Sequence, residues 1–223
     1  MNPVIRRLIL KDWRLNRSLI SLTVAVGLVA LVLMQSGSRT HRLLGGVWFF
    51  VALCILASML PARAILNERR KQTLAFVMSL PISSVQYSIA KIVSLWAMFL
   101  LPWLTLLASA LLLIDTRQIV PRGAIPMLFI VSMLPFVGFC LISAAALVGE
   151  SEGWLGAAGL LCNSSYWFVW YLLARIPSLT AHLRGPVAVW NSTARTVFSA
   201  EIGLIVLILA LTLFFQSRKR DFI

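Results

Sequence analysis

The sequence predicts an all-α integral membrane protein, and three observations carry that prediction. Hydrophobic residues make up 60% of the 223 positions, and the mean hydropathy is +0.93. The apolar residues gather in runs of about 20, the length that a helix needs to cross a hydrocarbon core of roughly 30 Å. Charged residues, with the exception of Glu201, fall between those runs or at their edges. We therefore expect a single transmembrane domain over residues 1–223.

Residues 2–17 are too charged to insert and are typical of an amphipathic helix that lies on the membrane surface. Its apolar face would carry Val4, Ile5, Leu8, Ile9, Trp13 and Leu15, and its basic face Arg6, Arg7, Lys11, Arg14 and Arg17. We expect Arg7, Lys11, Trp13 and Arg14 to hold it at the interface. Asp12 is the exception on the apolar face, and we expect it to pair with a neighbouring cation. A secretory signal is the alternative, but no small-residue cleavage site follows 18–34.

Six membrane spans follow, at about 18–35, 46–66, 87–113, 124–148, 154–174 and 197–216. The last span contains Glu201, whose charge is tolerated best in the first turn of a helix, close to the interface. The two longest connections, 67–86 and 175–196, lie on opposite sides of the membrane in this arrangement. Thirteen of the 20 Lys and Arg residues fall on the side of the termini and of 67–86, and seven on the other. The bias predicts that both termini and 67–86 are cytoplasmic.

Several classes of function are disfavoured by composition. The net charge of +13 is explained by orientation and by contact with anionic lipid, so nucleic acid is not an expected partner. No metal site is expected, because His41 and His182 are isolated. Cys54, Cys140 and Cys162 each lie in an apolar run without paired spacing, as buried free thiols do.

The sequence also lacks the elements of several activities. It has no glycine-rich phosphate loop and no HExxH or GxSxG motif, so we expect neither ATP hydrolysis nor an intramembrane enzyme from this chain. A carrier driven by an ion gradient usually needs intramembrane charges to bind the ion, and these are scarce here.

Prolines and small residues interrupt the apolar runs. Gly149, Gly153 and Ala157 are spaced by four residues, a pattern that lets helices pack closely, and we expect helix packing there. Four prolines are expected to kink or end spans: Pro61, Pro102, Pro126 and Pro135.

The segment 67–86 is the most informative part of the chain. Asn67 is a plausible helix N-cap, and a charged first turn, Glu68–Lys71, follows it. Apolar residues dominate the next turns, and Pro81 ends the helix. A short polar helix held at the membrane face is suited to bind a cytoplasmic protein. The alternative is a basic loop helix that rests on anionic lipid.

These residues resemble the type 2 ABC transporter permeases, the membrane subunits of many bacterial exporters. The matching residues of the cytoplasmic helix are Glu68, Arg69, Arg70, Thr73, Leu74, Ser79, Leu80 and Pro81, with Lys91 at the start of the third span. The N-terminal run Leu10-Lys11-Asp12-Trp13-Arg14, with Asn16 and Arg17, is similar to the family's first helix. The chain departs from the pattern at Gln72, where glycine is common, and at Ala75, which is often acidic.

The resemblance implies a mechanism in the bacterial inner membrane. Two permease chains pair around a translocation path, and each docks its coupling helix, here about 67–81, on a cytoplasmic ATPase that binds the ATP and Mg²⁺. Glu150 and Glu152 would add a second cytoplasmic contact. The segment 175–196 would correspond to the family's short re-entrant helices near the exit.

Other functions stay open from the residues alone. A membrane scaffold or sensor could use the same helix to recruit a different protein, and a stand-alone carrier would need no ATPase. The sequence does not distinguish a homodimer from a heterodimer. An uncharged, aromatic-rich interior suggests a lipophilic or amphipathic cargo.

Overall fold

Long helices lying side by side make up the part of the chain that the computed structural model describes, residues 3–36, 38–66, 84–117, 120–149 and 152–218. Over those residues there is no strand, which confirms the all-α prediction. The helices are α1 (Pro3–Met34), α2 (Arg39–Pro61), the π-helical η1 (Ala62–Leu66), α5 (Ser84–Arg117), the 3-10 helix η2 (Arg122–Ala124), α6 (Ile125–Val148), α7 (Glu152–Ala174), α8 (Pro177–Thr180) and α9 (Ser192–Arg218).

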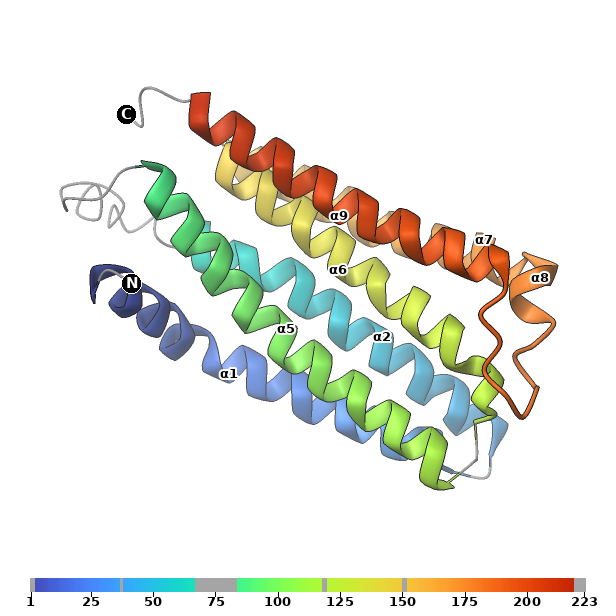
Figure 1. The fold of residues 1–223 in the computed structure, drawn as a ribbon. Helices are drawn as coiled ribbons and strands as arrows, with labels where there is room; N and C mark the ends of the chain where they lie inside the picture. The colour runs from blue at the N-terminus through green and yellow to red at the C-terminus, as the bar shows by residue number, and fades with distance from the viewer. Residues whose placement is uncertain (1–2, 37, 67–83, 118–119, 150–151, 219–223) are drawn as a thin grey trace.

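The helices alternate in direction, so the bundle has two distinct ends (Figure 1). Helices α1 and α5 begin, and α9 ends, at one end, which we call the near end. The α1–α2 turn, the α5–α6 turn and α8 lie at the opposite end, which we call the far end. The two described ends of the chain, the start of α1 and the end of α9, are therefore both at the near end.

Five helices of the described part are long and apolar enough to cross a membrane: Leu10–Met34, Arg39–Ile65, Ile89–Arg117, Arg122–Val148 and Ser192–Arg218. Each overlaps a predicted span. The remaining predicted span, 154–174, lies in α7, whose 23 residues extend about 35 Å at 1.5 Å per residue. Asn163, Ser164 and Ser165 in its middle make α7 more polar, and it is not among the five. That α7 is a sixth span stays a prediction.

The predicted boundary between a surface segment, 2–17, and a first span, 18–35, is not a helix end. Helix α1 is continuous over 32 residues, because neither proline nor glycine interrupts the sequence between Val4 and Val26. The stretch that can cross a membrane begins already at Leu10. Most of the predicted surface segment thus belongs to the same continuous helix as the first span. Only the turns of α1 before Leu10 stay candidates for a surface helix.

Helix α6 is the centre of the bundle. Of its 24 residues, 14 are buried, whereas α9 buries six of 27. Phe99 of α5 stacks on Phe139 of α6 with ring centroids 4.4 Å apart. Because lipid tails are as apolar as these side chains, such packing stabilises the bundle through van der Waals contact. The three cysteines are free and buried, as the sequence predicted.

Glu201 lies deeper in its helix than the favourable first-turn position. Helix α9 begins at Ser192, five residues before the predicted start, because Asn191 caps it by accepting a hydrogen bond from the Ala194 N–H at 2.8 Å. Glu201 is therefore in the third turn and only 8% exposed. Within the described residues, neither of its carboxylate oxygens has a hydrogen-bond partner.

The connection 175–196 folds back onto the far end of the bundle. It contains one helix of four residues, α8, where the resemblance implied several short helices. The Gly123 N–H donates to the Gly185 carbonyl at 3.0 Å and so joins the connection to the α5–α6 turn. A Cβ on Gly123 would lie 2.0 Å from the His182 carbonyl oxygen, so only glycine fits there.

We expect Gly138→Ala to destabilise the protein, because Gly138 of α6 makes room for Tyr166 of α7. A Cβ at position 138 would lie 1.6 Å from the Tyr166 hydroxyl oxygen and 2.5 Å from Cζ. Overpacking of this kind costs about 1–3 kcal/mol, which should lower the midpoint of thermal unfolding in detergent. Gly203→Ala is the control, since a Cβ there meets nothing within 4 Å. Equal midpoints would contradict the packing of α7 on α6.

Candidate coupling site at the near end

The predicted coupling residues fall outside the described part of the chain: Glu68, Arg69, Arg70, Thr73, Leu74, Ser79, Leu80 and Pro81. The structure does place the helices on either side of them. Helix η1 ends at Leu66 and α5 begins at Ser84, and both points lie at the near end, as does the start of α1 (Figure 1). The site is therefore defined by the helices from which the connection 67–83 leaves and to which it returns.

A buried ion pair joins α1 to α5 at this end. Lys91 Nζ lies 2.7 Å from Asp12 Oδ2, and the two residues are 4% and 3% exposed. Ser94 Oγ lies 3.4 Å from the same carboxylate oxygen and donates to it. Asn16 Nδ2 donates to the Asp12 carbonyl oxygen at 2.9 Å. We call Asp12, Asn16, Lys91 and Ser94 the near-end cluster.

The near-end cluster fixes the first helix after the connection 67–83. Lys91 lies seven residues, about two turns, after Ser84, so the ion pair holds the start of α5 against α1. Burying two charges costs several kcal/mol per ion, and close pairing with further hydrogen bonds offsets that cost only in one geometry. The pair therefore restricts the relative position of the two helices.

Sequence reasoning found one half of this pair. Asp12 was the acid on an apolar face, and its predicted pairing with a cation is confirmed, but this cation is not the sequence neighbour that was expected. The partner, Lys91, lies 79 residues away. In the sequence, Lys91 was indicated only by the family resemblance, because nothing in the local pattern connects it with Asp12.

An irregular turn precedes the connection. Pro61 is the last residue of α2, and Ala62–Leu66 form a π-helical turn. Proline has no N–H to donate to the Ala57 carbonyl four residues earlier, so the α-helical hydrogen bonding is interrupted there. Single π-helical turns are frequent at functional sites. Pro61 therefore sets the direction in which the chain leaves α2 toward 67–83.

The small-residue run at 149–157 is divided between two helices. Gly149 follows the end of α6, and its N–H donates to the Ala145 carbonyl at 2.8 Å. A Cβ on Gly149 would lie 2.5 Å from that carbonyl oxygen and 3.1 Å from Trp154 Cβ. Gly153 and Ala157 are exposed on α7. The run is therefore not one stripe on one helix, and packing through its α7 part stays a prediction.

The structure describes only some of the other residues that were predicted to make contacts at the near end. Glu150 lies outside the described residues, and Glu152 is the first residue of α7. On α1, Trp13 is half-buried and packs against the core of the bundle. Arg14 is exposed, Lys11 is half-buried, and Arg7 lies in the first turns of the same helix. Contact of these residues with lipid stays a prediction.

Comparison with known proteins adds one finding. The sequence matches the model of a family described as "ABC-2 family transporter protein" over residues 7–150. The match covers more than half of the chain and includes both residues of the ion pair. A search of curated proteins and a search of solved structures each found no significant match.

We expect Asp12→Asn and Lys91→Met each to destabilise the protein strongly. Removing one partner takes the close opposite charge away from the buried group that remains, at a cost of about 3–5 kcal/mol. The double variant Asp12→Asn/Lys91→Met should recover much of that loss, because neither position then carries a buried charge. Thermal unfolding of the purified variants in detergent measures the three effects.

Asp115→Asn is the matched control, because it breaks an exposed pair with Arg122, worth about 0–1 kcal/mol. If the two single variants were no less stable than Asp115→Asn, the buried pair would have no structural role.

Proposed function

Because the chain belongs to the ABC-2 family of transporter proteins and is thus a permease subunit of an ABC transporter, we propose that it is an exporter subunit that pairs with a second permease chain. In this proposal a separate cytoplasmic ATPase binds ATP and Mg²⁺ and drives transport through 67–81. The near end then faces the cytoplasm of a bacterial cell, and the far end faces outward.

The observation that carries this proposal is the near-end cluster. A force applied to the connection 67–83 reaches α5 at Ser84, and the Asp12–Lys91 pair would transmit it to α1 two turns later. A permease driven by a partner needs such a rigid link between its docking segment and its spans. It needs no buried ion-binding site, and this agrees with the scarcity of intramembrane charge.

The family match also favours transport over the scaffold, sensor and stand-alone carrier that the residues alone left open. A scaffold would recruit a cytoplasmic protein without moving cargo, and a carrier would work without an ATPase. The three candidates therefore differ in whether they bind an ATPase and in whether they transport cargo without it. One set of variants, assayed for bound ATPase and for transport, distinguishes them.

We expect Glu68→Gln and Leu74→Ala to separate this chain from its ATPase while leaving its amount in the membrane unchanged. The first change removes a charge and the second an apolar contact from the docking segment. Co-purification through a C-terminal tag after mild solubilisation measures the partner, and the same preparation identifies the second permease chain. Transport should fall in parallel with the bound ATPase.

Matched controls lie at the far end. Asp115→Asn removes an exposed acid, and Leu43→Ala shortens an exposed leucine, 63% accessible. Both control variants should retain the ATPase. An ATPase that co-purifies equally with all four variants would contradict docking through 67–81, and transport without any ATPase would favour the stand-alone carrier.

The Asp12→Asn/Lys91→Met variant tests the mechanical role of the near-end cluster. We expect it to reach the membrane and to bind the ATPase, because its docking segment is unchanged. Its transport rate per bound ATPase should be reduced, since α1 is no longer fixed to α5 by the ion pair. Wild-type transport by this variant would show that the link has a structural role only.

A further inference from the structure

The far end of the bundle carries a charge pattern that orientation does not explain. Seven arginines lie in its turns and helix ends, against a single acid, Asp115. They are Arg39, Arg42, Arg117, Arg122, Arg175, Arg184 and Arg195. Asp115 pairs with Arg122. The side away from the termini should be poor in Lys and Arg, so this accumulation of cations calls for another reason.

The type of cation points to that reason. The two lysines that the structure describes, Lys11 and Lys91, both lie toward the near end, and each of the seven cations described at the far end is arginine. Either residue can set orientation. The planar guanidinium differs from an ammonium in binding phosphate and carboxylate groups through two parallel hydrogen bonds. The far end is therefore suited to bind an anionic group.

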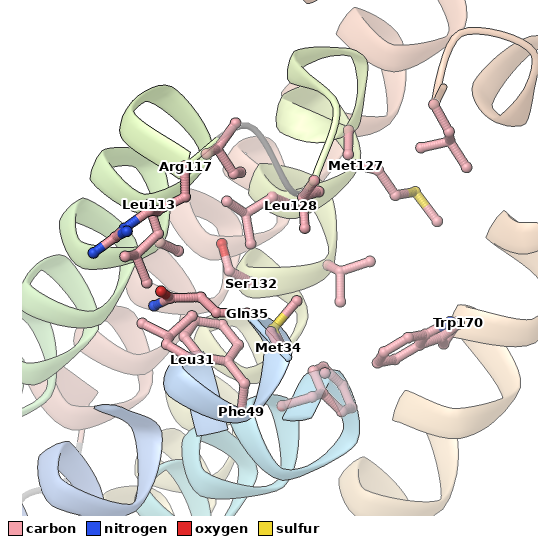
Figure 2. A pocket seen from close by; sticks show the side chains of 18 residues that line it. Leu31, Met34, Gln35, Phe49, Leu113, Arg117, Met127, Leu128, Ser132 and Trp170 are labelled. Carbon is pink, nitrogen blue, oxygen red and sulfur yellow. The ribbon is translucent and has the colours of Figure 1, made fainter. Parts of the chain in front are cut away.

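An apolar cavity of about 250 Å³ opens beside one of these arginines. It lies between α1, α2, α5, α6 and α7, and its walls are mainly aliphatic and aromatic, including Leu31, Phe49, Leu113 and Trp170 (Figure 2). Empty apolar cavities of about 150 Å³ already stay dry and bind apolar ligands. This space is therefore suited to an alkyl chain.

The polar atoms of the cavity are few and lie mostly at one side. The hydroxyl of Ser132 donates to the Phe129 carbonyl at 3.0 Å and so is already used. Figure 2 shows the guanidinium of Arg117 and the side-chain amide of Gln35 on the same side of the cavity. Arg117 is exposed, and within the described residues it forms no ion pair.

We infer that this cavity binds an anionic phospholipid, with an acyl chain inside the cavity and the phosphate on Arg117 and Gln35. The apolar wall and the cation at its edge match the two halves of that molecule, and the membrane around the bundle supplies it. The site needs neither the ATPase nor transport, so this inference goes beyond the proposed function and can fail independently of it.

The test compares binding of phosphatidylglycerol and phosphatidylcholine with equal acyl chains to the purified protein, by titration in native mass spectrometry. We expect the wild-type protein to bind phosphatidylglycerol more tightly. Arg117→Gln should weaken phosphatidylglycerol binding about tenfold, because a charge-assisted hydrogen bond is lost. Arg39→Gln, with the same charge change outside the cavity, should weaken it much less.

A second pair of variants tests the cavity itself. Gly46 lines it, and a Cβ there meets nothing within 4 Å, so the side chain of Gly46→Phe can enter the space and should abolish tight binding of either lipid. Gly203→Phe, on α9 and outside the cavity, is the control. Equal affinity for the two lipids, or equal effects of Arg117→Gln and Arg39→Gln, would mean non-specific lipid around the helices and would overturn the inference. So would wild-type binding by Gly46→Phe.

Discussion

In a hydrocarbon environment every backbone N–H and C=O must find its partner within the protein, and this constraint determines the form of the molecule. A helix meets it within a single segment, so the described chain consists of long helices whose irregular backbone is confined to the two ends. The same environment removes the usual contrast between an apolar core and a polar surface. Large apolar side chains are exposed along α7 and α9, where they can face lipid or another chain at little cost. What distinguishes the interior is close packing, as in the stacked rings of Phe99, Phe136 and Phe139.

Among the described residues, few polar interactions join different helices, and the buried ion pair among them lies at one end. At the near end, Asp12 and Lys91 fix α1 to α5, and Gln216 of α9 donates to the Leu147 carbonyl of α6 at 2.6 Å. At the far end, Gly123 and Gly185 join two connections through the backbone. The near end thus contains buried charge between α1 and α5, the helix that follows the connection 67–83. The far end contains exposed arginines, one of which, Arg117, lines an apolar cavity, so the two ends are suited to different tasks.

The sequence located most of the helices because hydropathy and length are local properties. Five of the six predicted spans correspond to helices that can cross a membrane, and the cysteines were correctly predicted as free and buried. Predictions failed where neighbouring segments decided the outcome. The continuity of α1 through residues 17 and 18 followed from the absence of a helix breaker, but the charges of 2–17 favoured a separate element. Asn191 was not recognised as the cap of α9, so Glu201 was placed too close to the helix end.

For the candidate site, the sequence by itself determined which residue types were available: a lone acid in an amphipathic helix, a basic segment between two spans and a proline at each end of that segment. Only the tertiary structure decided that Asp12 meets Lys91, because contact between residues 79 positions apart depends on how whole helices pack. The cavity beside Arg117 likewise cannot be predicted from the sequence, since its walls come from five long helices whose apolar residues resemble the others along the chain. Local patterns specify helices, whereas the space between helices exists only once they are assembled.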